Sequence, residues 1–362
     1  MTRKLRVLIV DDSALMRKVL KEIIMTDPDL EVAGTARDGQ DAIAKAHDLK
    51  PDVITMDINM PVMDGLTAMQ YILNDYPEVP VLIISSLTTE GALTTFEALE
   101  LGAFDYVAKP SGTVSANIHV VGREIIQKIK LAYKSANRRS YKDRIKRLST
   151  AGAAQKPEPA IKTGMPKGTG VTKVVVIGIS TGGPGTLMEV LPMLPPELEA
   201  ALIVVQHMPP TFTSTFAKRL DSACRFPFKE AEAGDVLQNG RGYLAPGGYH
   251  LLVRRESGML RLSTNPKTVF MPSVNVTMES VLNAYGGKNV IGVLMTGMGD
   301  DGADAMVKIR KAGGITIAED ESTAVVFGMP REAIERGGAE IIAPSYRIAE
   351  EIVKAVRRTK II

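Results

Sequence analysis

Cysteine is nearly absent from this sequence, which excludes a fold stapled by disulfides. The 362 residues include one cysteine, Cys224, so no disulfide can form within the chain. Paired cysteine and histidine ligands with the spacing of a zinc site are also lacking. Because disulfides persist in oxidising compartments, we expect a reducing one. Cys224 has no base beside it in the sequence, and we predict that it packs in the interior.

Long apolar runs and a strong charge bias are absent too. The basic opening 1–6 resembles the start of a signal peptide, but the apolar stretch 7–10 ends at once at Asp11. This stretch is too short for export or for crossing a membrane. The net charge of +3 is small for the length of the chain, so no nucleic-acid partner is indicated. We expect a cytoplasmic protein without membrane insertion.

The first part of the chain alternates short apolar segments with amphipathic ones. The predicted strands are 6–10, 31–35, 53–56, 81–85 and 106–108. Stretches between them, such as 14–25 and 40–48, carry apolar residues at helical spacing. Such alternation is typical of βαβ units. We predict a doubly wound, flavodoxin-like domain with five parallel strands over residues 1–133.

A change of composition separates this domain from a second α/β domain. Residues 134–170 are first basic and then rich in Ala, Gly, Pro and Lys without periodicity, which predicts a linker. Alternation resumes over 171–362, where we predict a larger, mainly parallel and doubly wound α/β domain. Its predicted strands are 173–179, 201–205, 242–244, 250–253, 290–295 and 314–318.

Polar residues follow or end four of the five strands predicted in the first domain. Asp11 and Asp12 follow the first strand, Asp57 follows the third, Ser85 ends the fourth and Lys109 follows the fifth. Ligands of open α/β sheets bind beyond the carboxyl ends of the strands, so these side chains should converge. Three carboxylates in one pocket need a cation, and an all-oxygen site suits Mg²⁺. Asp57 would then be a phosphoryl acceptor assisted by Lys109 and Ser85.

The alternative is that each aspartate caps a helix and Lys109 is solvated. Five such residues at strand ends argue against it. The motifs 10–13 (Val-Asp-Asp-Ser), 56–65 (Met-Asp-Ile-Asn-Met-Pro-Val-Met-Asp-Gly) and 106–110 (Tyr-Val-Ala-Lys-Pro) resemble those of response-regulator receiver domains. The resemblance implies that Asp11, Asp12 and Asp57 bind Mg²⁺ and that a histidine kinase phosphorylates Asp57. The resemblance also implies that Ser85, Tyr106 and Lys109 relay the change that phosphorylation causes.

The second domain opens with a serine at a sharp turn. The predicted strand 173–179 leads into Gly178-Ile179-Ser180-Thr181-Gly182, which fits the nucleophile pattern G-x-S-x-G. A dinucleotide-binding or phosphate-binding loop is the alternative, but G-x-G-x-x-G and a following Gly-Lys-Ser/Thr are missing. Ser180 is therefore the candidate nucleophile. The backbone N–H groups of Thr181 and Gly182, or that of Met298, are candidates for an oxyanion hole.

A serine nucleophile needs a base and an acid that orients the base. His207 follows a predicted strand and is better placed than His250, which starts one and is expected to pack or face solvent. Asp300 and Asp301 follow the predicted strand 290–295. One of them should orient His207, and the carboxylate of the other is expected to cap the next helix.

Four motifs in this domain resemble the CheB methylesterases. They are 178–183 (Gly-Ile-Ser-Thr-Gly-Gly), 206–210 (Gln-His-Met-Pro-Pro), 296–303 (Thr-Gly-Met-Gly-Asp-Asp-Gly-Ala) and 326–330 (Val-Phe-Gly-Met-Pro). The resemblance selects Asp301 as the acid and implies a hydrolase with a Ser180, His207, Asp301 triad. The implied reaction is the demethylation of glutamate methyl esters on chemotaxis receptors, with deamidation of receptor glutamines. No cofactor is expected in the hydrolase domain.

Two departures from the family pattern lie before and after Pro272-Ser273-Val274. Val269-Phe270-Met271 stands where relatives commonly carry Arg or His, and Asn275 replaces a common Asp. We expect both near the substrate groove without contact to the triad.

Two other functions would each account for part of the sequence. A transcription factor would need a helix-turn-helix after the linker, where strand–loop–helix units stand instead. A nucleotide-binding adaptor would leave His207 and Asp301 unexplained.

Overall fold

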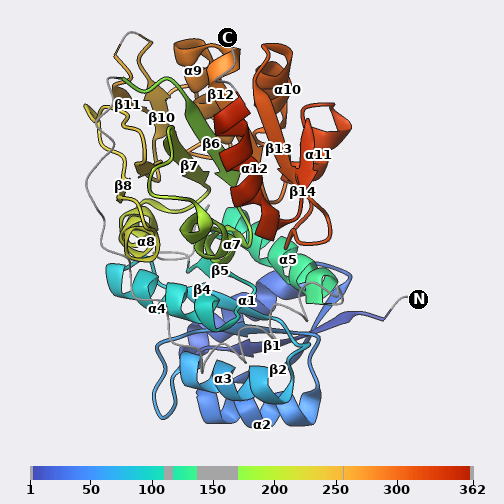
Figure 1. Ribbon diagram of the computed structural model, residues 1–362. Coiled ribbons are helices and arrows are strands. Elements are labelled where there is room, and N and C mark those ends of the chain that lie inside the picture. Colours follow the sequence, from blue (N-terminus) through green and yellow to red (C-terminus); the bar gives the residue numbers. More distant parts are fainter. Residues whose placement is uncertain (1–2, 110–116, 137–169, 256, 359–362) are drawn as a thin grey trace. The chain divides into compact units, whose positions relative to one another are not determined.

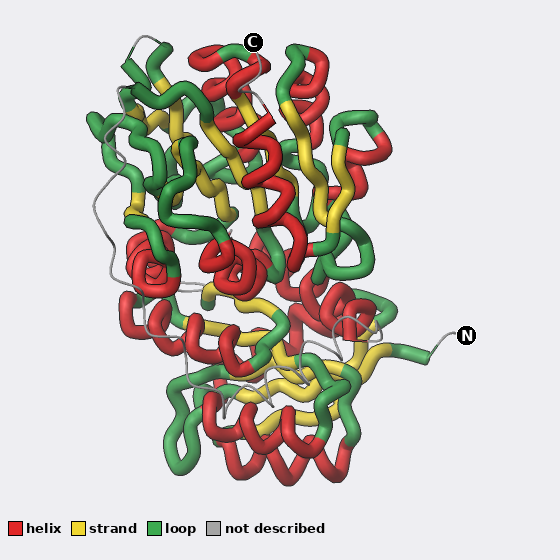
Figure 2. The backbone as a smooth tube through the Cα atoms, in the orientation of Figure 1, coloured by secondary structure: helices red, strands yellow, loops and turns green. Residues whose placement is uncertain are grey.

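The computed structural model describes residues 3–109, 117–136, 170–255 and 257–358, in two compact units, Met1–Lys156 and Pro157–Ile362. Figure 1 colours the chain along the sequence, and Figure 2 colours it by secondary structure. The predicted limits of the domains, at 133 and 171, stay predictions, because most of the predicted linker lies outside the described residues. In the described ranges, no helix is long and apolar enough to cross a membrane.

The first unit has one parallel sheet in the order β2-β1-β3-β4-β5. Its strands are β1 (Leu5–Val10), β2 (Leu30–Ala36), β3 (Val53–Met56), β4 (Val81–Ser85) and β5 (Asp105–Ala108). The chain moves outward from β1 to β2 and then returns to the other side of β1 with β3. This reversal opens a crevice at the carboxyl ends of β1 and β3, where ligands bind in such folds.

Helices follow each strand of this sheet. They are α1 (Ala14–Met25), α2 (Gly39–Leu49), α3 (Gly65–Asp75), α4 (Thr89–Leu101) and α5 (Asn117–Ala136). Side-chain oxygens of Ser13, Asp38, Asp64 and Thr88 accept a backbone N–H in the first turns of α1 to α4. These caps satisfy N–H groups that have no partner inside a helix, which explains why the helices begin where they do.

The second unit has a seven-stranded parallel sheet in the order β14-β13-β12-β6-β7-β9-β8. Its strands are β6 (Val174–Ile179), β7 (Ala201–Gln206), β8 (Phe228–Glu230), β9 (Gly242–Leu244), β12 (Val290–Leu294), β13 (Ile315–Glu319) and β14 (Ile341–Ala343). All six residues of β6 and of β7 are buried. The order reverses beside β6, because β7 lies on one side of it and β12 on the other.

Helices pack on this sheet, and a hairpin stands apart from it. The helices are α7 (Gly183–Val190), α8 (Pro210–Ala223), α9 (Val274–Tyr285), α10 (Ala303–Lys311), α11 (Met329–Glu335) and α12 (Ser345–Arg358). In Figure 1, α12 lies across β12, β13 and β14, which it contacts. The hairpin pairs β10 (His250–Val253) with β11 (Leu260–Ser263) in antiparallel register.

Every strand that the sequence predicts is present, and the two α/β domains are confirmed. The bounds of the strands agree within a residue or two. Strands β8, β11 and β14 were not predicted, because each has only three or four residues, which is too short for periodicity to distinguish a strand from a loop reliably. Cys224 is buried at the end of α8, as predicted.

Candidate functional site

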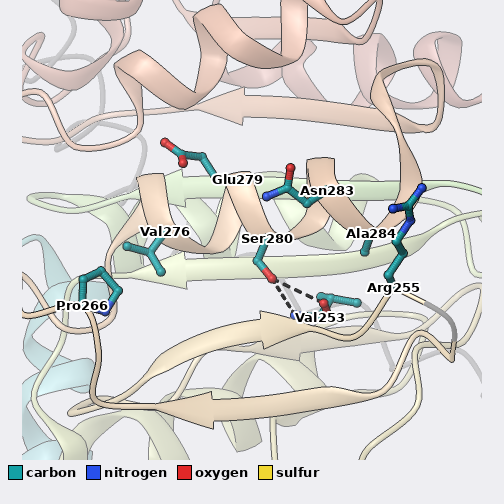
Figure 3. Close-up of a pocket in the computed structure, with 8 residues that line it drawn as sticks. All are labelled: Val253, Arg255, Pro266, Val276, Glu279, Ser280, Asn283 and Ala284. Atoms are coloured by element: carbon teal, nitrogen blue, oxygen red, sulfur yellow. Dashed lines mark hydrogen bonds between the residues drawn. The ribbon is translucent and has the colours of Figure 1, made fainter.

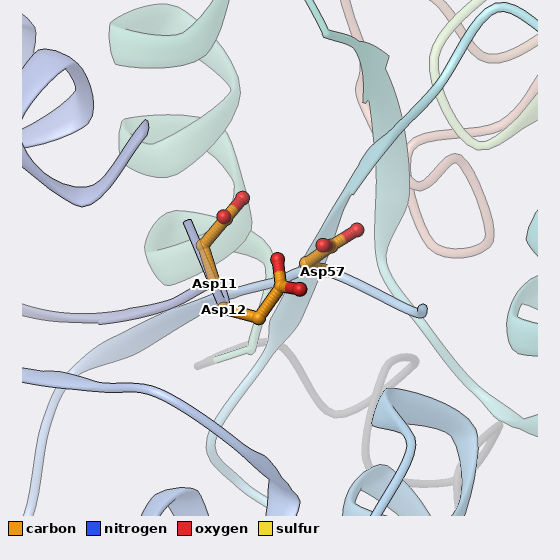
Figure 4. A group of neighbouring side chains, drawn as sticks. All are labelled: Asp11, Asp12 and Asp57. Atoms are coloured by element: carbon orange, nitrogen blue, oxygen red, sulfur yellow. The ribbon is translucent and has the colours of Figure 1, made fainter. Parts of the chain in front are cut away.

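The carboxylates predicted at the strand ends of the first unit do converge. Asp11 follows β1, Asp57 follows β3, and oxygen atoms of Asp11, Asp12 and Asp57 lie within 4.8 Å of one another (Figure 4). Lys109 reaches in from the end of β5, with Nζ 2.8 Å from Asp11 Oδ2 and 2.7 Å from Asp57 Oδ2. Asp11 and Asp57 are buried, and Asp12 is exposed. The crevice between β1 and β3 is therefore an acidic site with one ammonium group.

Charge balance makes this site fit a divalent cation. Burial raises the pKa of Asp57, and the charge of Asp11 raises it further, although Lys109 acts in the opposite direction. Burial lowers the pKa of Lys109, but the two carboxylates outweigh burial and leave that pKa raised. Three carboxylates against one ammonium leave an excess of negative charge on oxygen atoms only. Oxygen donors of this kind are those that Mg²⁺ prefers.

Ser85 and Tyr106, which are also predicted to relay the change caused by phosphorylation, contact neighbouring helices. Ser85 Oγ donates to the carbonyl of Gly91 in α4 at 3.1 Å and accepts from Thr95 Oγ1 at 2.7 Å. Tyr106 is buried, and the ammonium of Lys128 in α5 lies 5.3 Å from the centre of its ring. Ser85 and Tyr106 thus connect the strand ends to α4 and α5. Their role in a relay stays a prediction.

In the second unit, Ser180, His207 and Asp301 are brought into hydrogen-bond contact. They follow β6, β7 and β12, which are three adjacent strands of the sheet. Ser180 Oγ lies 3.1 Å from His207 Nδ1, and His207 Nε2 lies 2.8 Å from Asp301 Oδ2. With Asp301 accepting the Nε2–H, Nδ1 keeps its lone pair toward the serine hydroxyl. This is the geometry of a nucleophile, a base and an orienting acid.

Asp301 is held ionised by the start of α9. Its Oδ1 accepts from Ser273 Oγ at 2.9 Å, and Oδ2 accepts from the backbone N–H of Val274 at 2.7 Å. Burial raises the pKa of Asp301, but the hydrogen bonds from His207 and from the backbone of α9 outweigh burial and lower it. Asp301 therefore carries a charge opposite any positive charge that forms on His207.

The prediction that Asp300 caps the next helix is wrong. Helix α10 begins at Ala303 without a side-chain cap. Asp300 is exposed, and its carboxylate pairs with Arg336 at 2.6 Å. Arg336 follows α11 and is 36 residues from Asp300 in the sequence. No local sequence pattern therefore indicates this ion pair.

Backbone hydrogen bonds fix the turn that presents Ser180. The Ser180 N–H donates to the carbonyl of Thr296 at 2.9 Å, and Thr296 Oγ1 donates to the carbonyl of Thr181 at 2.8 Å. Gly182 has φ +75°, and a Cβ there would lie 2.6 Å from Val325 Cβ. Only glycine fits this position without strain. The turn after β6 is thus braced by the loop after β12.

The candidate oxyanion donors lie on these two loops. Within the described ranges, the backbone N–H groups of Thr181, Gly182 and Met298 donate no hydrogen bond. Thr181 and Gly182 directly precede α7, whose first N–H groups lack helical acceptors. These groups remain candidates for binding a developing negative charge.

Comparison with known proteins places this geometry in a family. A family model described as CheB methylesterase matches residues 175–352, and one for the response regulator receiver domain matches residues 7–117. A "Protein-glutamate methylesterase/protein-glutamine glutaminase" of Caldanaerobacter subterraneus subsp. tengcongensis is 54% identical over 366 residues, which cover 98% of each chain. The chain belongs to the CheB methylesterase family.

Other CheB relatives resemble it over similar or shorter lengths. A protein-glutamate methylesterase/protein-glutamine glutaminase of Syntrophomonas wolfei is 54% identical over 362 residues, covering 98% of this chain and 100% of the relative. The crystal structure of the Thermotoga maritima CheB methylesterase catalytic domain covers 50% of this chain and 97% of that chain, at 42% identity and a TM-score of 0.49.

The two departures from the CheB pattern contact the triad, contrary to expectation. Phe270 stacks on His207, with ring centroids 4.2 Å apart and planes 7° apart. The Asn275 N–H donates to Asp301 Oδ1 at 3.0 Å, while the Asn275 side chain accepts from the N–H of Ala305 in α10 at 2.9 Å. Both segments were expected only near the substrate groove. The contacts could not be predicted, because Phe270 is far from His207 in the sequence and Asn275 is far from Asp301.

Sequence reasoning also missed residues that support this CheB site. Gln206 Nε2 donates to the carbonyl of Ser180 at 2.9 Å and to that of His207 at 3.1 Å. His250 starts β10, as predicted, and is fully buried, where its Nδ1 accepts from the Ser273 N–H at 3.1 Å. Glutamine and histidine side chains can form the hydrogen bonds observed here, but the local sequence does not show which groups they contact.

A separate hollow lies along the flank of α9 (Figure 3). It measures about 540 Å³ and is bounded by β10, α9 and the segment after β11. Ser280 lines it, and its Oγ accepts from the Val253 N–H at 2.8 Å. None of Ser180, His207 and Asp301 lines this hollow. The hollow is distinct from the site of the triad.

Proposed function

We propose that this chain is a phosphorylation-regulated protein-glutamate methylesterase that also deamidates protein glutamines. The contact of Ser180, His207 and Asp301 at the ends of three adjacent strands is the observation that carries the proposal. The substrates are methylated chemotaxis receptors, and the phosphodonor is a chemotaxis histidine kinase. The predicted location of this chain is the cytoplasm.

The reaction proceeds through an acyl-enzyme. Ser180 Oγ attacks the carbonyl carbon of a glutamate methyl ester, and His207 Nδ1 takes the hydroxyl proton. His207 then gives this proton to the leaving methoxide, so that methanol departs. Water attacks the acyl-enzyme with the same base, which frees glutamate and restores the serine. With glutamine as substrate, ammonia leaves in place of methanol.

Asp301 holds the Nε2–H of His207 and stabilises the imidazolium that forms in each half-reaction. Its lowered pKa keeps the carboxylate charged near neutral pH. The N–H groups of Thr181, Gly182 and Met298 are the candidates for stabilising the oxyanion. Their fixed position on two braced loops means that little reorganisation is needed as charge develops.

The receiver takes the phosphoryl group on Asp57. Asp11, Asp12 and Asp57 would hold Mg²⁺, which when bound neutralises charge on phosphoryl oxygens. Lys109 already contacts Asp57 and is placed to pair with a phosphoryl oxygen there. Ser85 and Tyr106 connect this site to α4 and α5, so a change at Asp57 would reach both helices.

The decisive assay is methanol release from a methylated receptor with and without acetyl phosphate. We expect release in both conditions and faster release with the phosphodonor. Asp57→Asn should abolish phosphorylation and the stimulation, because an amide cannot form the acyl phosphate. Asp75→Asn, at the exposed end of α3, is the matched control. No methanol from the wild-type chain would refute the esterase, and stimulation of Asp57→Asn would show that another residue accepts the phosphoryl group.

A further inference from the structure

A segment that contains none of the three triad residues crosses the face of His207. We call residues 264–273, which join β11 to α9, the strap. Phe270 in the strap stacks nearly parallel on the imidazole, with ring centroids 4.2 Å apart and an interplanar angle of 7°. The hydrogen bonds of His207 to Ser180 and Asp301 lie at the two nitrogen atoms, on the edges of the ring. They leave the face of the ring to Phe270.

The strap is itself held in place at several points. The buried side chain of His250 donates from Nε2 to the carbonyl of Pro266 at 2.8 Å and accepts at Nδ1 from the Ser273 N–H at 3.1 Å. The Gly248 N–H donates to the carbonyl of Met271 at 2.9 Å. Anchors on both sides of Phe270 hold the backbone that carries its ring. The stack is therefore part of a braced structure, as positioning groups require.

The stack limits how His207 can move. Its side chain is only 7% exposed. Rotation of the imidazole out of its plane would break both edge hydrogen bonds and the face contact together. A base must stay within hydrogen-bond reach of its serine, and small displacements reduce rates strongly.

We propose that Phe270 is a positioning residue for His207, an inference that rests on the proposed function. Its ring fixes the plane of the imidazole and stabilises the imidazolium formed when His207 takes the proton of Ser180. The face of an aromatic ring attracts a cation, and this attraction exists only while the imidazole is protonated. An interaction present in the transition state and absent in the ground state raises kcat rather than substrate affinity.

The test compares Phe270→Leu with Phe270→Tyr in the full chain. Leucine keeps an apolar cover without a π face, and tyrosine keeps the face. We expect Phe270→Leu to lower kcat for methanol release about tenfold with KM changed less than about twofold. Labelling of Ser180 by a fluorophosphonate, which needs no receptor, should slow by a similar factor. Phe270→Tyr should keep both the rate of methanol release and the rate of labelling close to those of the wild type.

A matched control is Tyr346→Leu, an exposed aromatic residue of α12 whose loss should change neither rate. Should Phe270→Leu melt at a lower temperature than wild type, Phe270→Met supplies a similar volume without a π face and takes its place. Three outcomes overturn the inference. They are an unchanged kcat, a loss confined to KM, and a tyrosine variant as slow as the leucine variant.

Ser180→Ala, measured beside these variants, separates this inference from the proposed function. If Ser180→Ala still releases methanol at the wild-type rate, the triad assignment itself fails. If Ser180→Ala is inactive and Phe270→Leu is as fast as wild type, only the role of Phe270 fails.

Discussion

Two buried aspartates, Asp57 in the receiver and Asp301 in the hydrolase, have similar exposure and opposite pKa shifts. The exposed fraction is 5% for Asp57 and 8% for Asp301. Burial raises the pKa of both carboxyls. At Asp301 the hydrogen bonds from His207 and α9 outweigh burial, and the pKa falls. At Asp57 the ion pair with Lys109 does not outweigh burial, because the charge of Asp11 also raises the pKa.

The difference shows that the partners of a carboxylate, more than its depth, decide what it can do. Both oxygens of Asp301 are occupied by donors from α9 and His207, an arrangement that suits a fixed charge proposed to orient a base. Asp57 accepts one backbone N–H, from Ile58 at 2.9 Å, and otherwise faces Lys109 and a like charge. A carboxylate held in that way suits a nucleophile that awaits a cation and a phosphoryl group.

Ser180→Ala should separate the two sites most strongly. Removal of the nucleophile should lower methanol release by about 10⁴-fold or more, with a residual rate from the oxyanion donors. Phosphorylation of Asp57 by acetyl phosphate should stay unchanged, because its chemistry lies in the other unit. Methanol release and phosphorylation are measured on the same preparation, with Ser222→Ala on the exposed end of α8 as control. Retained esterase activity would contradict the assignment of Ser180.

Asp301→Asn compared with Asp300→Asn tests the hydrolase half of the comparison. The two residues are adjacent, but only Asp301 accepts from His207. Asp301→Asn should lower kcat by about 10⁴-fold, because an amide can leave His207 in the wrong tautomer. Asp300→Asn should change kcat less than about twofold, since an exposed ion pair contributes little. Equal losses in the two variants would contradict the assignment of Asp301, and not Asp300, as the acid that orients His207.

A fragment of residues 171–362 tests whether the receiver restrains the hydrolase. The described part of this fragment carries its own sheet and core, so we expect it to fold alone. It should release methanol severalfold faster than the unphosphorylated full chain at matched concentration, since a large receptor must reach the triad. Circular dichroism confirms folding. An equal or lower rate for the folded fragment would favour a receiver that stimulates the hydrolase directly.

The smallest expected effects are changes of stability with opposite signs. The lowered pKa of Asp301 contributes stability that is complete above its ordinary value of 3.8 and is lost as pH falls through the folded pKa. The raised pKa of Asp57 acts in reverse, and stability is lost as pH rises from 3.8 through the folded pKa. At pH 7 in EDTA, Asp301→Asn should therefore lower the melting temperature of its unit, and Asp57→Asn should raise that of its own. Calorimetric shifts of the same sign would contradict this account.

Most of the fold and the polar ends of the strands could be predicted because both depend on local sequence. Apolar alternation marked the longer strands, and parallel strands in one sheet place their carboxyl ends at a common edge. The convergence of Asp11, Asp57 and Lys109, and that of Ser180, His207 and Asp301, followed from this rule. The choice of Asp301 over Asp300 needed the family resemblance, because the two residues are adjacent and chemically alike.

The surroundings of His207 were decided by tertiary structure alone. Phe270 and Ser273 lie in an irregular segment far from His207 in sequence, and irregular segments have no periodicity to show which way a side chain points. The opposite pKa shifts of Asp57 and Asp301 likewise depend on donors and charges that approach through space. Sequence by itself determined which groups stand at the ends of the strands. Only the tertiary structure decided what holds each group in place, because those contacts join segments whose separation along the chain carries no local signal.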